Sequence, residues 1–271
     1  MSNSPTIPQQ KIDEALPDLQ ASVSMCFHCF DTLLQNLRLS YPQLHSVLQA
    51  QNKNEKPSFL ADLGKEGVKC PMFVTWEKKR EQSLDDVYDL RGCIGSLSPL
   101  PVATALTKYA LISALQDTRF NPIHPSELPM LRVAVSLLVK YEPCQTAYDW
   151  TVGIHGIIIQ FTVDGTSYSA TYLPEVAQEQ GWGRAASVNS LIRKAGYAQQ
   201  ISPQLIESIQ CTRYQSSKHK MTFETFLQCL EKQDLVAMAA CLEKACLSLL
   251  KQSNQQYSNQ QQVSQAGCDV L

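Results

Sequence analysis

Large apolar side chains recur at every second position over residues 131–139, and this pattern constrains the fold more than any other. The apolar positions are Leu131, Val133, Val135, Leu137 and Val139. Successive side chains of a strand point to opposite faces of a sheet, so the alternation predicts a strand with one face in a hydrophobic core. The chain is therefore expected to build a sheet and to cover one side of it.

Two β-hairpins are predicted around this strand. The runs M-F-V-T-W at 72–76 and L-R-G-C-I at 90–94 are rich in β-forming residues and flank a polar turn. Farther along, Asp164 and Gly165 join two β-rich runs, and this dipeptide is typical of a tight hairpin turn. A further strand is expected at 208–214, S-I-Q-C-T-R-Y.

Helices are predicted between these strands. Residues 24–40 and 101–116 show the apolar spacing of helices, and Pro101 suits a first turn. Shorter helices are expected at 174–180 and 186–195. Because strands and helices are interleaved while two connections are hairpins, the predicted fold class is α+β, a mixed, largely antiparallel sheet with flanking helices.

The sequence also predicts how the chain is divided. The tetrapeptides G-C-I-G at 92–95 and G-I-H-G at 153–156 suggest two lobes that arose by internal duplication. The expected organisation is a flexible arm (1–21), one main domain (22–230), a C-terminal helix (231–250) and a disordered Q/N/S-rich tail (251–271).

Charge and composition favour some functional classes over others. With 23 Lys and Arg against 25 Asp and Glu, the chain lacks the basic footprint of a nucleic-acid binder, so nucleic acid is an unlikely ligand. No signal peptide and no run of ~18 apolar residues is found, so no transmembrane segment is predicted and a cytoplasmic and/or nuclear location is expected. The ten cysteines are then expected to be mostly reduced and buried.

A cluster at the N-terminus resembles half of a zinc site. Cys26, His28 and Cys29 lie close in sequence, but no second Cys/His pair with matching spacing follows. On a helix the side chains at these positions point in different directions, and Phe27 and Phe30 are expected to occupy the face that packs on the core. Helix packing is the favoured interpretation, so no metal and no cofactor is predicted.

Six ordered blocks carry a resemblance to a known family. They are L-R-G-C-I-G, D-T-R-F-N-P-I, D-W-T-V-G-I-H-G, T-Y-L-P-E-V-A-Q-E-Q-G-W, S-L-I-R-K-A-G-Y and T-R-Y-Q-S. Together they resemble the signature of the AMMECR domain family (type one), over about residues 22–230. The chain departs from the family pattern at Ser96, Leu97, Gly183 and Gln215.

The resemblance implies more about fold than about activity. It implies an α+β fold, and it implies association with Memo-like and radical-SAM proteins at the level of the family. For the eukaryotic branch it implies a regulatory role in basic cellular machinery. No reaction follows from it, so whether the protein is an enzyme stays open.

The cysteine of L-R-G-C-I-G suggests one candidate chemistry. An adjacent guanidinium and exposed amides would lower the pKa of a thiol, so Arg91 can activate Cys93 as a nucleophile or redox group. His155 is the candidate base and Glu175 the group that orients it. The resulting enzyme would catalyse acyl or redox transfer.

A binding role is the preferred alternative. Here Arg91 supplies charge, and main-chain amides beside glycines hold a carboxylate, phosphate or peptide terminus. The candidate ligand-binding residues are Arg91, Gly92, Gly95, Gly153, Gly156, Trp182, Lys194, Arg213 and Tyr214. The chain is thus predicted to be an intracellular regulatory or adaptor protein that recognises a small anionic group or a peptide in a cleft at L-R-G-C-I-G. The expected partner is another protein or a small anionic ligand.

The last four residues, C-D-V-L, have three interpretations. Cys268 is a candidate lipidation site in a C-a-a-X-like box, although Asp269 is not aliphatic. The terminal carboxylate and Leu271 also suit a PDZ-type groove. The third interpretation, an inert terminus, is favoured.

Overall fold

The computed structural model describes residues 19–40, 59–63, 67–80, 86–232, 242, 246–249 and 251. Its strands are β1 (Lys69–Lys79), β2 (Tyr88–Pro101), β3 (Leu131–Pro143), β4 (Gly156–Val163), β5 (Thr166–Tyr172) and β6 (Gln210–Thr222). Its helices are α1 (Val23–Ser40), α2 (Phe59–Asp62), α3 (Val102–Leu115), the 3-10 helix η3 (Pro125–Met130), α4 (Pro174–Glu179), α5 (Arg184–Lys194), α6 (Pro203–Ser208) and α7 (Phe223–Lys232). This confirms the predicted α+β class.

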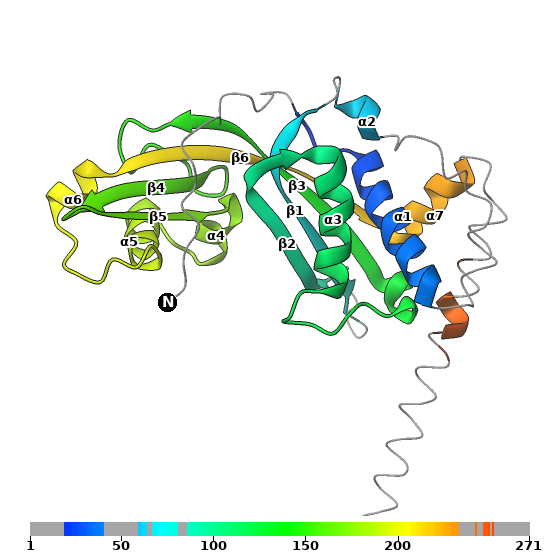
Figure 1. Ribbon diagram of the computed structural model, residues 1–271. Helices are drawn as coiled ribbons and strands as arrows, with labels where there is room; N and C mark the ends of the chain where they lie inside the picture. Colours follow the sequence, from blue (N-terminus) through cyan, green and yellow to red (C-terminus); the bar gives the residue numbers. More distant parts are fainter. Residues whose placement is uncertain are drawn as a thin grey trace, which may run out of the picture.

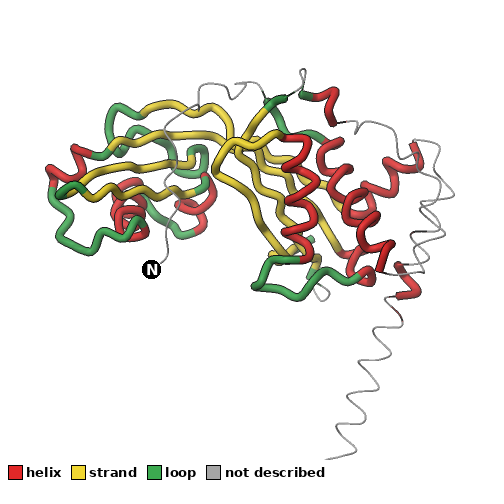
Figure 2. Tube along the Cα trace, in the orientation of Figure 1, coloured by secondary structure: helices red, strands yellow, loops and turns green. Residues whose placement is uncertain are grey.

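One six-stranded sheet runs through both lobes of the molecule (Figure 1). Its order is β2-β1-β3-β6-β4-β5, and every neighbouring pair is antiparallel. The long strands β3 and β6 connect the large lobe, with α1, α3 and α7, to the small lobe, with α4, α5 and α6 (Figures 1 and 2). The lobes therefore share a sheet but have separate helical layers.

The large-lobe core lies between the sheet and helices α1 and α3. Trp76 of β1 is fully buried there, and its indole N–H donates to the carbonyl of Ala110 at 3.0 Å. Phe30 of α1 meets the Trp76 ring edge-on at 5.1 Å. The alternating apolar residues of β3 face the same helices, as their strict period predicts.

The small-lobe core is built by β4, β5 and α5. It includes Trp150, Ile159 and Leu191, which are all buried. The hairpin between β4 and β5 turns at Asp164 and Gly165, whose φ angles of 49° and 76° suit the predicted tight turn. The predicted helix stop at Gly196 is also confirmed, because this residue has φ 96°.

A third, smaller cluster lies where the lobes meet, on the sheet face opposite α1 and α3. Leu138, Ile158 and Tyr214 are buried in it. The β3–β6 register shifts between Val139 and Glu142, and Tyr141 within this bulge stacks on Tyr214 at 5.1 Å. The junction is thus packed and not a loose connection.

The strands extend beyond their predicted limits. Strand β6 continues to Thr222 although residues 215–220 carry no apolar alternation, because each pairs in register with β3. The two G-x-x-G tetrapeptides differ in conformation: the first lies within β2, whereas the second spans a turn that enters β4. Most of the expected C-terminal helix and Q/N/S-rich tail, including Cys268 and the C-D-V-L sequence, lies outside the described residues, as does most of the expected N-terminal arm.

Candidate functional site

The L-R-G-C-I-G motif lies in β2, the edge strand of the sheet, and the free edge at Cys93 is covered by two side chains. The Cys93 amide donates to Asp117 Oδ2 at 2.9 Å, and the Cys93 carbonyl accepts from Arg119 Nη2 at 3.1 Å. Asp117 and Arg119 therefore bond to the strand edge as a neighbouring strand would.

The Arg119 guanidinium is held in place but leaves one edge open. It forms two hydrogen bonds with Asp117, from Nε at 2.9 Å and from Nη2 at 2.6 Å, and lies 5.5 Å from the ring centre of Phe120. Within the described part of the chain, Nη1 has no hydrogen-bond partner, and the side chain is 54% exposed. Arg119 thus presents a fixed cationic donor beside Cys93.

Asp117 is the buried member of this pair. Its residue is 5% exposed, and the Arg119 guanidinium holds the pKa of the Asp117 carboxyl well below its usual range. The amides of Cys93 and Arg119 add to this effect because both donate to the carboxylate. The carboxylate stays ionised and keeps Arg119 oriented.

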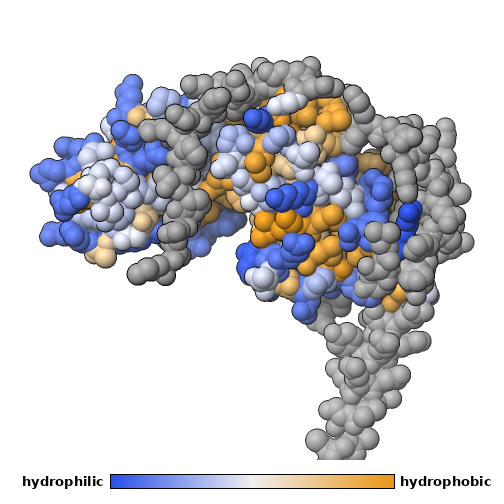
Figure 3. Space-filling view, in the orientation of Figure 1, coloured by the Kyte–Doolittle hydropathy of each residue, from blue (hydrophilic) through white to orange (hydrophobic). Residues whose placement is uncertain are grey.

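The sheet face opposite α1 and α3 brings further polar groups to Cys93. Thr75 of β1 is the cross-strand partner of Cys93, and Lys218 lies on β6. Lys218 is close enough that its charge lowers the pKa of the Cys93 thiol. Its ammonium also approaches Glu175 of α4 at 3.9 Å. Blue, hydrophilic residues lie on both lobes in the space-filling view (Figure 3).

An apolar floor adjoins these polar groups. The half-buried side chains of Phe73, Leu97, Tyr141 and Leu173 pack against the junction cluster. Tyr214 lies fully buried beneath them, and its hydroxyl donates to the Tyr172 carbonyl at 3.1 Å. The site therefore combines two cationic groups with an apolar surface.

Burial controls the state of the Cys93 thiol. Burial is the largest influence and raises its pKa above the ordinary 9.0, whereas the Thr75 hydroxyl, which donates to Sγ at 3.1 Å, acts in the opposite direction. The charge of Arg119 also lowers this pKa. The net shift is upward, so Cys93 is a protonated thiol at neutral pH.

Arg91 is held by contacts with η3 and with the segment that follows Arg119. Trp76 pairs with Gly92 and Glu77 pairs with Leu90, so Arg91 lies in a β-bulge and has no paired residue on β1. Its guanidinium forms a bidentate pair with Glu127 of η3, with both contacts at 2.9 Å.

The remaining hydrogen bonds of Arg91 join it to the segment 117–122, which includes Asp117 and Arg119. The guanidinium also donates to the carbonyls of Asn121 and Pro122 at 2.8 and 3.4 Å. Arg91 thereby braces the segment that carries Asp117 and Arg119, and it makes no contact with the Cys93 thiol.

The glycines of the motif allow close packing. A Cβ on Gly92 would lie 2.0 Å from the Ser113 carbonyl oxygen of α3, and one on Gly95 would lie 2.1 Å from the Met72 carbonyl oxygen. In the second motif, a Cβ added to Gly156 would lie 2.5 Å from Cζ of the Tyr214 ring, and Gly153 adopts φ 79° in the turn. These positions require the absence of a side chain.

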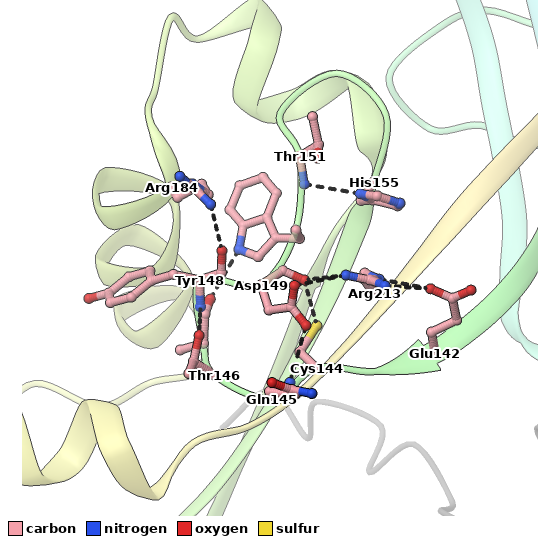
Figure 4. A network of polar contacts seen from close by, with 12 residues as sticks. Glu142, Cys144, Gln145, Thr146, Tyr148, Asp149, Thr151, His155, Arg184 and Arg213 are labelled. Carbon is pink, nitrogen blue, oxygen red and sulfur yellow. Dashed lines mark hydrogen bonds and ion pairs between the residues drawn. The ribbon is translucent and has the colours of Figure 1, made fainter.

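His155 belongs to a network in the small lobe (Figure 4). Its Nδ1 accepts the Thr151 amide hydrogen at 3.0 Å, which leaves Nε2 as the protonated nitrogen of the neutral ring. Burial, and then the charge of Arg213, lowers its pKa. No contact joins His155 to Cys93, which lies on a strand of the other lobe.

Arg213 occupies the centre of the same network. It donates to Glu142 Oε2 from Nε at 2.8 Å, and from Nη1 to Asp149 Oδ1 at 2.9 Å and to the Asp149 carbonyl at 3.0 Å. It therefore ties the D-W-T-V-G-I-H-G block to β3.

The other residues expected at the site lie along the small lobe. Lys194 donates to the Thr171 carbonyl at 2.9 Å and lies 4.5 Å from the Tyr172 ring centre, while burial lowers its pKa. Trp182 stands 6.0 Å from the same ring. Glu175 faces Lys218, and no hydrogen bond joins it to His155.

The residues that surround Cys93 were largely missed by the sequence analysis. They are Thr75, Asp117, Arg119 and Lys218. Asp117 and Arg119 lie within D-T-R-F-N-P-I, so the resemblance of this block to the family could have suggested them as site residues. Thr75 and Lys218 could be placed only from the strand register and the strand order, which the sequence does not provide.

The described residues contain neither a candidate metal cluster nor a membrane-spanning helix. No grouping of three His, Cys, Asp or Glu side chains among them suits a metal ion, and none of their helices is long and apolar enough to cross a bilayer. Cys26 and Cys29 are buried in the core, and His28 Nε2 lies 2.8 Å from the Thr107 hydroxyl. These contacts support helix packing for this cluster.

Comparison with known proteins identifies the family but no activity. The family model described as AMMECR1 matches residues 23–219. An uncharacterized protein of Arabidopsis thaliana is 38% identical over 211 residues, which cover 77% of this chain and 89% of that protein. An uncharacterized protein of Schizosaccharomyces pombe is 45% identical over 142 residues, which cover 52% and 72% of the two chains.

A solved structure has a similar fold. The crystal structure of an uncharacterized protein from Pyrococcus horikoshii matches with a TM-score of 0.51 and 24% identity, covering 72% of this chain and 89% of that one. The family model and the plant relative together establish the classification. This chain belongs to the AMMECR1 family.

Proposed function

We propose that this protein is an intracellular regulatory or adaptor protein that binds an anionic peptide segment on the open sheet face beside Cys93. The anionic group is a carboxylate or a phosphate, and the proposed location is the cytoplasm and/or nucleus. The observation that carries the proposal is the Arg119 guanidinium, which Asp117 and the Cys93 carbonyl hold in place while Nη1 stays unpaired among the described residues.

Lys218 and the apolar floor support the same proposal. Lys218 adds a second cation whose nearest acidic contact, to Glu175, is 3.9 Å long. Two cationic donors beside half-buried aromatic and aliphatic side chains suit a peptide that carries an acidic group next to an apolar residue. Arg91 contributes indirectly, because it braces the segment that bears Arg119.

The alternative, an enzyme that uses Cys93 with His155, receives less support. The thiol has a raised pKa, and the two side chains make no contact. Only the Thr75 hydroxyl and the charges of Arg119 and Lys218 favour a thiolate. A binding role requires neither a thiolate nor a base.

Selection from a displayed peptide library tests the proposal. The wild-type chain should enrich peptides that combine an acidic or phosphorylated residue with a neighbouring apolar residue. The variant Lys218→Gln removes a charge without removing a hydrogen bond from the fold. It should weaken binding of the enriched peptides about tenfold, the typical effect of losing one charge-assisted contact.

Arg80 provides the matched control. It forms a bidentate pair with Asp89, as Arg119 does with Asp117, and its side chain is 58% exposed, but it lies at the turn of the β1–β2 hairpin. Arg80→Gln should leave peptide affinity unchanged. Equal binding by the wild type and Lys218→Gln, or no enrichment at all, would refute the proposal.

A further inference from the structure

Two cysteines of the small lobe lie opposite each other where β3 ends beside β6. The Cys144 amide donates to the Cys211 carbonyl at 2.8 Å, directly after the Pro143–Thr212 pair of the ladder. Residues that lie opposite each other in an antiparallel ladder have Cα atoms about 4.5–5.5 Å apart. This separation lies within the range of roughly 4.4–6.8 Å that disulfides span.

The strand register places the two thiols on the same face of the sheet, and both are free. Each is close enough to affect the pKa of the other. Cys144 is half-buried and Cys211 is buried, so an oxidant reaches Cys144 first. A small rotation of the side chains would bring the sulfur atoms together.

Cys144 belongs to the network around Arg213 (Figure 4). Cys144 Sγ donates to the Asp149 carbonyl at 3.2 Å, and the same carbonyl accepts from Arg213 Nη1 at 3.0 Å. The charges that face the pair are those of Arg213, which favours the Cys144 thiolate, and Asp149, which opposes it. Burial has the largest effect and keeps both thiols protonated at neutral pH.

We propose that Cys144 and Cys211 form a reversible disulfide in the presence of a hydroperoxide. The peroxide first transfers one oxygen to Cys144, which becomes a sulfenic acid while the peroxide is reduced to an alcohol or water. The Cys211 sulfur then attacks the Cys144 sulfur, the S–O bond breaks, and water leaves with the Cys211 proton. Two thiols are oxidised by two electrons in all, and a dithiol reductant reverses the change.

The disulfide would change the loop that carries His155. It removes the S–H donor to the Asp149 carbonyl, and it ties together two positions that are 67 residues apart. The amides between Thr151 and His155 should therefore exchange at a different rate in the oxidised protein. Closing so long a loop should also raise the melting temperature by several degrees.

Peptide mapping of the full chain tests this proposal. The protein is treated with hydrogen peroxide, the remaining thiols are alkylated, and the chain is digested without reduction and analysed by mass spectrometry. A peptide that links Cys144 to Cys211 should appear and should disappear after treatment with dithiothreitol. Alkylation of both residues after oxidation, with no linked peptide, would overturn the proposal.

A variant and an internal control make the result specific. Cys144→Ser keeps a hydroxyl donor for the Asp149 carbonyl, so it should fold, and it should lose the linked peptide and the rise in melting temperature. Cys93 has Thr75 and no thiol as its side-chain partner, so it should appear in no linked peptide. Persistence of the melting-temperature rise in Cys144→Ser would assign it to another pair and overturn the proposal.

Discussion

Replacing Gly92 with alanine tests whether the first glycine of L-R-G-C-I-G serves packing. The sequence suggested that this glycine exposes backbone to a ligand, whereas in the structure it lies buried against α3. An added Cβ would lie 2.0 Å from the Ser113 carbonyl oxygen, although real Cβ atoms essentially never approach closer than 3.0 Å. The obstacle is backbone, so no side-chain rotation relieves the clash.

The structure therefore predicts a large loss of stability. Overpacking of this kind typically lowers the free energy of unfolding by about 2–3 kcal/mol. With a denaturant slope on the order of 2–3 kcal/mol per molar urea, the unfolding midpoint of Gly92→Ala should fall by about 1 M. The slope itself should not change, because the folded surface is nearly the same.

Urea unfolding followed by circular dichroism measures this effect. Gly183→Ala is the matched control, because nothing lies within 4 Å of a Cβ at Gly183 and its φ of −77° suits alanine. That variant should unfold within about 0.5 kcal/mol of the wild type. An unchanged midpoint for Gly92→Ala would refute the packing argument and restore an exposed role for this glycine.

Three further predictions follow from the same segment. Arg91→Met should lower the free energy of unfolding by about 2 kcal/mol in urea titrations, because it leaves the Glu127 carboxylate without its bidentate partner; an effect below about 0.5 kcal/mol would contradict the bracing role. Asp117 has a folded-state pKa below its ordinary 3.8, so its contribution to stability is present above pH 3.8 and is lost as the pH falls lower. Urea midpoints measured from pH 5 downward should therefore fall less steeply for Asp117→Asn, and parallel curves would count against this account. Thr75→Val should raise the pKa of the Cys93 thiol further, because the hydroxyl hydrogen bond favours the thiolate, and the pH dependence of iodoacetamide alkylation at Cys93 measures the shift; a lower pKa would contradict the assigned bond.

The fold was predictable wherever local chemistry and tertiary structure agree. Strand β3 shows a period of two because one face packs on helices, and the β4–β5 turn uses Asp164 and Gly165 because both need positive φ. The second half of β6 was not predictable from local sequence. Its polar residues form a strand because β3 pairs with them, and pairing over such a sequence distance leaves no local signal.

The site was less predictable for the same reason. Arg91 is next but one to Cys93, and sequence proximity suggested that it acts on the thiol. The bulge in β2 instead turns it toward Glu127, which lies 36 residues farther along. Arg119 and Lys218 approach Cys93 from a loop and from the fourth strand of the sheet, and only the strand order places them there.

The Arg119 side chain offers the most direct test of the proposed anion site. Its Nε–H signal in a nitrogen-15 spectrum can be followed while inorganic phosphate, or acetate in a parallel experiment, is titrated into the full-length protein at constant ionic strength. If Arg119 and Lys218 bind the anion, this signal should shift saturably at millimolar anion, with a weaker response in Lys218→Gln and an unchanged response in Arg80→Gln. An Arg119 signal that does not move, or that moves no more than that of Arg80, would contradict the proposed anion site.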